Sequence, residues 1–136
     1  MPAFYRRRRT YKYTLDTPYQ LLTPLRPLEA VGNGFLRLHP DGTLAIAAHY
    51  SWDGASGPMP DLPSIVRGSL VHDALYQLIR EGALAAKPHR READQLLRSL
   101  CLADGMSYLL AQWVYLCVRV FGGLFVRSPQ RALRNT

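Results

Sequence analysis

The chain has 136 residues, of which 48% are hydrophobic and 20% are charged, and its formal net charge is +7. This length allows one domain with a substantial core and excludes two independent domains. The positive charge favours anionic partners, namely nucleic acid, phosphorylated small molecules or an acidic lipid surface, without choosing among them. The two cysteines, Cys101 and Cys117, stand within apolar helical patterns, so we expect neither a disulfide framework nor a CxxC metal site.

Both ends of the chain are expected to lie outside the core of this single domain, residues 1–136. The N-terminal segment is strongly basic and has no apolar stretch typical of a signal peptide. We interpret residues 1–9 as a solvated basic tail or a strand edge, because charge runs are usually solvated. The alternative is contact with an anionic surface through four consecutive residues, Arg6, Arg7, Arg8 and Arg9. Residues 128–136 are polar and are expected to form a loose C-terminal tail.

The first half of the chain is predicted to be rich in β-strands. Apolar and polar residues alternate there with the period of two that is typical of half-buried strands. Four prolines between residues 10 and 50 disfavour long helices. The sequence Pro40-Asp41-Gly42 is a turn signal that joins the last two strands as a hairpin. The predicted strands cover residues 11–15, 19–22, 35–38 and 43–46.

The second half is predicted to be helical. Apolar residues recur there at helical spacing, and glycines mark the ends of each segment. The predicted helices cover residues 70–81, about 90–103, and 106–121, with Gly122 and Gly123 closing the last one. The fold class that follows is α+β, with a small N-terminal antiparallel β-sheet followed by two or three helices.

The third predicted helix is apolar enough to raise the question of a membrane. Gln112 and Arg119 interrupt residues 106–126, and they share one face because they are seven positions apart. The longest uninterrupted apolar run, residues 113–118, is far shorter than the roughly 20 residues that a span needs. We therefore predict a buried or amphipathic core helix and no integral membrane protein. The alternatives are a helix lying on a membrane surface and a helix spanning it.

The first predicted helix carries His72, Asp73 and Tyr76 within five positions. Residues four apart share one face of a helix, whereas neighbours point in directions about 100° apart. We therefore expect His72 and Tyr76 on one face and Asp73 leaning off it, so that a distant carboxylate has to orient the His72 ring. A single histidine on a helix is often structural, but three functional side chains together favour chemistry. His72 suits a general base, and Asp73 suits a ligand for a hard metal ion.

Two further sites are candidates for this chemistry. The segment 50–58 contains Gly54 and Gly57, and such a loop can offer backbone oxygens to a cation or amides to an oxyanion; an ordinary connection is the alternative. Asp94 lies near the start of the second predicted helix, beside its apolar stripe. It is either an acid favoured by the helix dipole or the missing orienting group, accepting hydrogen bonds from His72 and Tyr76 across an antiparallel helix pair.

The order of these features resembles the core of phospholipase A(2) enzymes, most closely the disulfide-free type carried by parvovirus capsids. The matching features are a glycine loop, His72-Asp73-x-x-Tyr76 on a helix, and Ala93-Asp94 on a second helix. The resemblance covers about 45 residues. The chain departs from the family in its loop, which lacks the form Tyr-Gly-x-x-x-Gly-x-Gly, and in having no cysteines beside His72.

This resemblance implies a role for each matching residue. His72 would deprotonate water, and Tyr76 and Asp94 would form its supporting network. Asp73 would bind Ca²⁺ together with backbone carbonyls of the loop. The implied carbonyl donors are Trp52, Gly54 and Gly57.

A second resemblance spans nearly the whole chain. The segments Tyr50–Pro58, Arg67–Gln77 and Asp104–Met106 are similar to a family of small proteins of unknown function encoded by tailed bacteriophages and prophages. Arg119 and the pair Phe121-Gly122 also stand where that family has them. The resemblance implies a phage origin and a place in the host cytoplasm or the virion, but it implies no activity.

Three functions are consistent with these patterns. The first is a phage-encoded, Ca²⁺-dependent hydrolase of a phospholipid or similar ester, with anionic lipid as its partner. The second is a non-catalytic virion component or host-interaction protein, in which the His-Asp-Tyr-Asp network braces the core. The third is an HD-type phosphohydrolase, which needs a further upstream histidine on a helix, whereas His39 and His49 lie in the β-rich half. Nucleic acid stays open as a partner.

Overall fold

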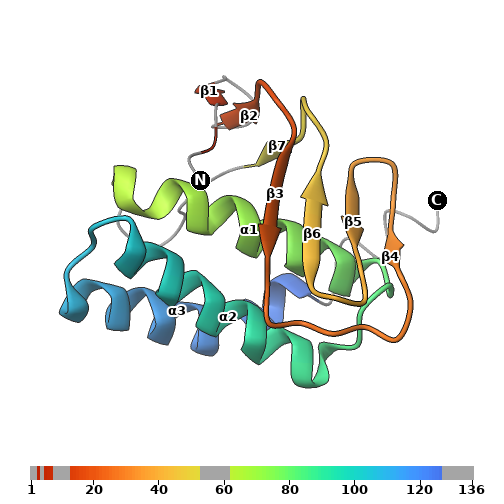
Figure 1. The fold of residues 1–136 in the computed structure, drawn as a ribbon. Helices are drawn as coiled ribbons and strands as arrows, with labels where there is room; N and C mark the ends of the chain where they lie inside the picture. The colour runs from red at the N-terminus through yellow and green to blue at the C-terminus, as the bar shows by residue number, and fades with distance from the viewer. Residues whose placement is uncertain (1–2, 4, 8–12, 53–61, 127–136) are drawn as a thin grey trace.

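The computed structural model describes residues 3, 5–7, 13–52 and 62–126. Within these residues short strands precede three helices, which confirms the predicted α+β class (Figure 1). The helices are α1 (Pro63–Arg80), α2 (Ala86–Ala103) and α3 (Tyr108–Val126). The strands are β1 (Tyr5–Arg7), β2 (Tyr13–Leu15), β3 (Tyr19–Leu22), β4 (Val31–Gly32), β5 (Leu36–Leu38), β6 (Thr43–Ile46) and β7 (Ser51–Trp52).

The strands form two antiparallel sheets instead of the single small sheet that was expected. One sheet has the order β1-β2-β7 and the other has the order β3-β6-β5-β4. Pro18 lies between β2 and β3, where the chain passes from one sheet to the other, and proline has no N–H to continue a ladder. The predicted hairpin turn joins β5 to β6, and Gly42 adopts a φ of 97° there, which favours glycine.

Part of the basic N-terminal segment belongs to a sheet. Residues Tyr5–Arg7 form the edge strand β1, in which Arg6 lies opposite Thr14 and Arg7 lies opposite Tyr13. The interpretation of this segment as a strand edge therefore holds for these residues. Arg8 and Arg9, and the predicted C-terminal tail 128–136, lie outside the described residues.

All three helices are longer than predicted, and α2 begins at Ala86 instead of about residue 90. Helix α1 begins at Pro63, seven positions before the predicted start, because proline fits the first position of a helix and the buried Ile65 and Val66 extend the apolar face. Helix α3 continues to Val126, so the prediction that Gly122 and the following glycine end it is wrong. Packing against α1 explains this continuation, because Gly122 lies directly against Tyr76.

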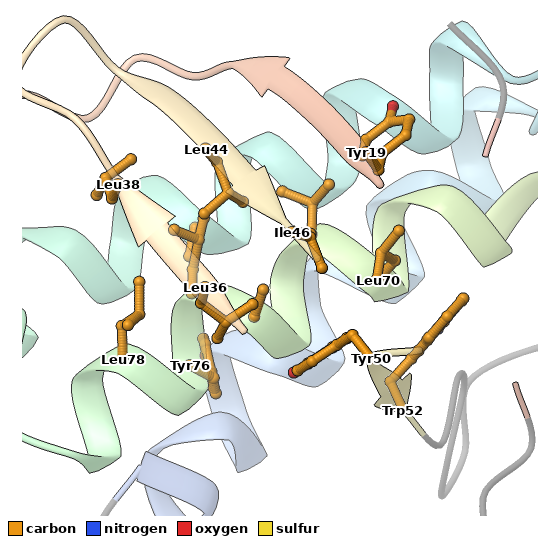
Figure 2. Packing of buried hydrophobic residues seen from close by; sticks show 14 of the residues in the cluster. Tyr19, Leu36, Leu38, Leu44, Ile46, Tyr50, Trp52, Leu70, Tyr76 and Leu78 are labelled. Carbon is orange, nitrogen blue, oxygen red and sulfur yellow. The ribbon is translucent and has the colours of Figure 1, made fainter. Parts of the chain in front are cut away.

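The core lies on both sides of α1. The four-stranded sheet lies on one side of this helix, and α2 and α3 lie on the other (Figure 1). Figure 2 shows sheet side chains such as Leu36 and Ile46 directed toward α1 residues such as Leu70 and Leu78, all of them buried. A second buried cluster joins the three helices through Ile65, Leu97, Cys101, Met106, Ala111, Val114 and Val118.

Helix α3 does not meet the requirements of a membrane span. In the part of the chain that the structure describes, every helix is too short or too polar to cross a bilayer. One face of α3 is buried against the helical core through Ala111, Val114 and Val118. The prediction of an amphipathic helix packed on the core is thereby confirmed for this face.

Candidate functional site

The centre of the site is a hydrogen bond between the antiparallel helices α1 and α2. Nε2 of His72 lies 2.7 Å from Oδ1 of Asp94. Both side chains are buried, with 7% of His72 and none of Asp94 exposed to solvent. The predicted contact between these two residues is therefore confirmed. It arises because His72 faces inward from the middle of α1 and Asp94 faces inward from the middle of α2.

Two further donors complete the environment of the Asp94 carboxylate. The Tyr76 hydroxyl donates to Oδ1 at 2.6 Å, as predicted, and Nη1 of Arg119 donates to Oδ2 at 2.8 Å. Asp94 of α2 thus accepts hydrogen bonds from both other helices, α1 and α3, while it is shielded from water. A buried carboxylate with several charge-assisted or strong partners is held ionised.

The ionisation of this network follows from burial and from these contacts. Burial alone would raise the pKa of Asp94, but hydrogen bonds from His72, Tyr76 and Arg119, together with the charge of His72, outweigh it and lower that pKa. Burial and the neighbouring negative charge of Asp94 raise the pKa of Tyr76 far above its ordinary value, so its hydroxyl remains a donor. Asp94 is therefore an anion that orients its neighbours without titrating near neutrality.

The second ring nitrogen of His72 faces a different carboxylate. Nδ1 lies 4.0 Å from Oδ1 of Asp73, which is beyond hydrogen-bond length but within the range of an ion pair. The two adjacent side chains are therefore close enough for an electrostatic contact, while their separation is too long for Asp73 to orient the ring by a hydrogen bond. Burial would lower the pKa of His72, but Asp73 and Asp94 outweigh it and raise that pKa.

The orientation of the His72 ring is fixed by its neighbours. The ring lies against that of Tyr76, with 4.0 Å between the centroids and 36° between the planes. Because Asp94 is an anion at Nε2, that nitrogen carries the proton of the neutral ring, and Nδ1 keeps its lone pair. The arrangement can therefore accept a proton at Nδ1 and stabilise the resulting imidazolium through Asp94.

Two arginines belong to the site although their roles were not predicted. Arg119 was expected only to interrupt the apolar third helix and to match a position of the resembled family, and Arg90 was expected only to mark the approximate start of the second helix. Nη2 of Arg90 donates to the backbone oxygens of Val118 and Arg119, at 3.0 and 2.9 Å, and so joins α2 to α3. The spacing of Arg90 four positions before Asp94, on the same face of α2, was a usable signal.

The predicted Ca²⁺ ligands are only partly described. The Asp73 side chain is 34% exposed, and its carboxylate is the kind of hard oxygen donor that Ca²⁺ prefers. Trp52 lies in β7, and its indole N–H donates to Ser69 at 3.0 Å. Gly54 and Gly57 lie outside the described residues. Asp73 could supply the carboxylate of a Ca²⁺ site that is completed by backbone carbonyls. Because two of the three carbonyl donors are not described, this site stays a prediction.

The two histidines of the β-rich half lie outside the helices. His39 follows β5 and His49 precedes β7, whereas the HD-type site requires its ligands on helices. Among residues 13–52 and 62–126, no three His, Cys, Asp or Glu side chains gather where they could hold a metal ion.

Comparisons of the chain with protein-family models, with curated proteins and with solved structures find no match. The site is therefore characterised by its own geometry. Its defining features are an inward-facing histidine with one nitrogen fixed by a buried carboxylate, and a second carboxylate, partly open to solvent, beside the other nitrogen.

Proposed function

We propose that the protein is a phage-encoded hydrolase of carboxylic esters, of the phospholipid class, in which His72 is the general base. The observation that carries this proposal is that the two nitrogens of the His72 ring face two different carboxylates. Nε2 is bound to the buried Asp94 at 2.7 Å, and Nδ1 lies on the side of the partly exposed Asp73. A histidine oriented by one buried anion is the arrangement that general-base chemistry needs.

The proposed reaction begins with a water molecule beside Nδ1. The water oxygen attacks the ester carbonyl carbon while its proton passes to Nδ1 of His72, and the positive charge that forms is balanced by Asp94. The same proton then passes to the leaving alkoxide as the carbon–oxygen bond breaks. Tyr76 and Arg119 keep Asp94 in place and ionised throughout. Because His72 must be neutral to accept the proton, the rate should rise with pH through its raised pKa.

A Ca²⁺ ion is the proposed cofactor. Asp73 would hold it, together with the predicted backbone donors at Trp52, Gly54 and Gly57. When bound, the cation would polarise the ester carbonyl and stabilise the negative charge that develops on its oxygen. The net charge of +7 supports an anionic lipid as substrate, since it attracts anionic surfaces.

A second candidate function is a non-catalytic virion or host-interaction protein, consistent with the resemblance to phage proteins. The observation that favours it is the complete burial of Asp94, whose carboxylate has three partners, two from α1 and one from α3. A fully satisfied buried network can serve to specify a unique packing of the helices. In that case His72 would contribute to stability alone.

Lipid hydrolysis with and without Ca²⁺ separates the two candidates. We would measure release of fatty acid from anionic phospholipid vesicles, and hydrolysis of a water-soluble short-chain ester, for the wild type and for His72→Gln. His49→Asn is the matched control, because His49 is exposed and its φ of 75° is one that asparagine tolerates. Unfolding by urea would report the stability of each variant.

The hydrolase predicts Ca²⁺-stimulated activity that His72→Gln reduces at least about a hundredfold, the size of a typical general-base contribution. Asp73→Asn should remove the stimulation by Ca²⁺ and leave the fold intact, because Asp73 is partly exposed. A wild type without ester hydrolysis, or a His72→Gln variant as active as His49→Asn, would contradict the hydrolase. Loss of stability in His72→Gln without any hydrolysis in the wild type would support the structural role.

A further inference from the structure

Helix α3 has an exposed apolar face that the core does not use. Its inner face is buried through Ala111, Val114 and Val118. On the opposite side, Leu109 is 81% exposed, Leu116 is 53% exposed and Val120 is 61% exposed. Apolar residues scattered singly on a surface are normal, but several on one face of one helix form a patch that suggests a partner.

The exposed residues form a continuous stripe. Leu109, Trp113, Leu116 and Val120 are separated by four, three and four positions. At about 100° per residue they fall within roughly 60° around the helix axis. We call these four residues the α3 stripe. Two more exposed aromatic residues, Tyr108 and Phe121, flank it near its two ends.

A cation of α2, Arg98, borders the α3 stripe. The segment Tyr108–Val126 contains no aspartate or glutamate, and its single charged residue, Arg119, is paired with the buried Asp94. Arg98 of α2 donates to Gln112 at 2.8 Å and lies over the ring of Tyr115, 4.3 Å from the centroid. These two contacts hold the Arg98 cation along the edge of the stripe, beside exposed apolar and aromatic side chains.

We propose that the α3 stripe binds the surface of an anionic lipid bilayer, with α3 lying in the plane of the interface. Leucine and valine would enter the boundary of the acyl chains, tryptophan and tyrosine would lie at headgroup level, and Arg98 would face the lipid phosphates. A second copy of the chain fits this face less well, because two molecules of net charge +7 repel each other. The proposal concerns where the protein binds and is independent of whether His72 is catalytic.

Trp113 provides a direct probe of this contact. The chain has two tryptophans: Trp52 is 2% exposed and Trp113 is 45% exposed. Insertion of Trp113 into the interface should shift its fluorescence emission to the blue and protect it from acrylamide. We would add vesicles of phosphatidylcholine with phosphatidylglycerol to the full-length protein, and vesicles of phosphatidylcholine alone for comparison. Trp113→Phe should bind similarly but lose the spectral change.

Leu116→Glu is the decisive variant, and Gln20→Glu is its control because it adds the same charge at an exposed position of β3. Leu116→Glu should weaken binding to the anionic vesicles at least about tenfold, since it adds a negative charge and removes apolar surface that the membrane would bury. Gln20→Glu should change binding by less than about twofold, and circular dichroism should show both variants folded. Leu116→Glu should retain any hydrolysis of a soluble ester, while His72→Gln should bind vesicles as the wild type does.

Three results would overturn the proposal. The first is a wild type that does not bind anionic vesicles. The second is vesicle binding in which the emission of Trp113 does not change and the affinity of Leu116→Glu equals that of the wild type. This result would assign the lipid contact to the N-terminal arginines. The third is a wild-type dimer in sedimentation that Leu116→Glu converts to a monomer, which would show that a second copy covers the α3 stripe.

Discussion

Gly122 of α3 lies so close to Tyr76 of α1 that a β-carbon at position 122 would collide with the tyrosine hydroxyl. Two carbons of the same ring would lie 3.1 Å from that β-carbon. Tyr76 has little freedom to move, because its hydroxyl donates to Asp94 and its ring lies against His72. The missing side chain at position 122 therefore allows α3 to approach α1 and bring Arg119 to the carboxylate.

Gly122→Ala should destabilise the protein by about 1–3 kcal/mol, the usual cost of overpacking a core. This loss should appear although alanine favours a helix over glycine by about 1 kcal/mol. Gly123→Ala is the matched control, because a β-carbon there would meet Arg90 at 3.8 Å, an ordinary contact. Urea unfolding should show Gly123→Ala as stable as the wild type or more so. Equal stability of the two variants would contradict the proposed collision.

Strands and turns were predictable where short local patterns of apolar and turn-forming residues mark them. The alternation in residues 11–15 predicted β2, the short apolar run at residues 19–22 predicted β3, and the turn signal at Pro40-Asp41-Gly42 predicted the hairpin of β5 and β6. The separation into two sheets was not predictable, since strand pairing depends on contacts distant in sequence. The start of α1 was missed because Pro63 was not used as a signal for the first position of a helix.

The contacts of the site that follow from helical periodicity were predictable. Four-residue spacing placed His72 beside Tyr76, and the need for a partner pointed to Asp94. Arg119 escaped prediction because its role depends on the way α3 crosses the other helices, which no local pattern encodes. Gly122 was misinterpreted for the same reason: glycine often ends a helix, but here close packing against Tyr76 requires it.

The stability of the protein should depend on pH through His72 and Asp94. The pKa of His72 is raised in the folded state, so its contribution is complete below the ordinary value of 6.5 and is lost as pH rises through the raised value. The pKa of Asp94 is lowered, so its contribution is complete above 3.8 and is lost as pH falls through the lowered value. The network should therefore stabilise the protein most between these two ordinary values.

Urea unfolding of the wild type and of His72→Gln, from about pH 5 to about pH 9, tests this dependence. The difference in free energy of unfolding between the two proteins should shrink as pH rises, because the wild-type histidine loses its proton. His49→Asn, a substitution of an exposed histidine, is measured in parallel as the matched control. A difference that is constant over this range would contradict the raised pKa, because it would mean that His72 has the same pKa in the folded and unfolded states.

Removing the charge of Asp94 should be the most costly single change in the site. Asp94→Asn should lower the free energy of unfolding by about 3–5 kcal/mol, because it leaves the cation of Arg119 without its buried partner. Asp94→Asn combined with Arg119→Gln should cost less than the sum of the two single variants. Asp104→Asn, which breaks the more exposed pair with Arg67, should cost only about 1 kcal/mol. Strict additivity of the first two variants would contradict the coupling.

Cys101 should report on opening of the helical core. Burial, with a smaller contribution from the charge of Asp104, raises the pKa of Cys101 to about 12, and none of the residue is exposed to solvent. In a Cys117→Ala variant Cys101 is the only remaining thiol of the chain, since the sequence contains two cysteines. The reaction of Cys101 with a thiol reagent at about pH 8 should be slow, because the reactive thiolate forms only after unfolding.

The rate of that reaction should follow stability. Adding Gly122→Ala to the Cys117→Ala variant should accelerate modification of Cys101 roughly tenfold for each 1.4 kcal/mol of stability lost, whereas adding Gly123→Ala should not accelerate it. The stability of the protein itself should fall above about pH 9, because the thiol then ionises in the unfolded chain but not in the folded one. Fast modification that is indifferent to Gly122→Ala would mean that Cys101 is reached through a local opening that leaves the contact between α1 and α3 intact.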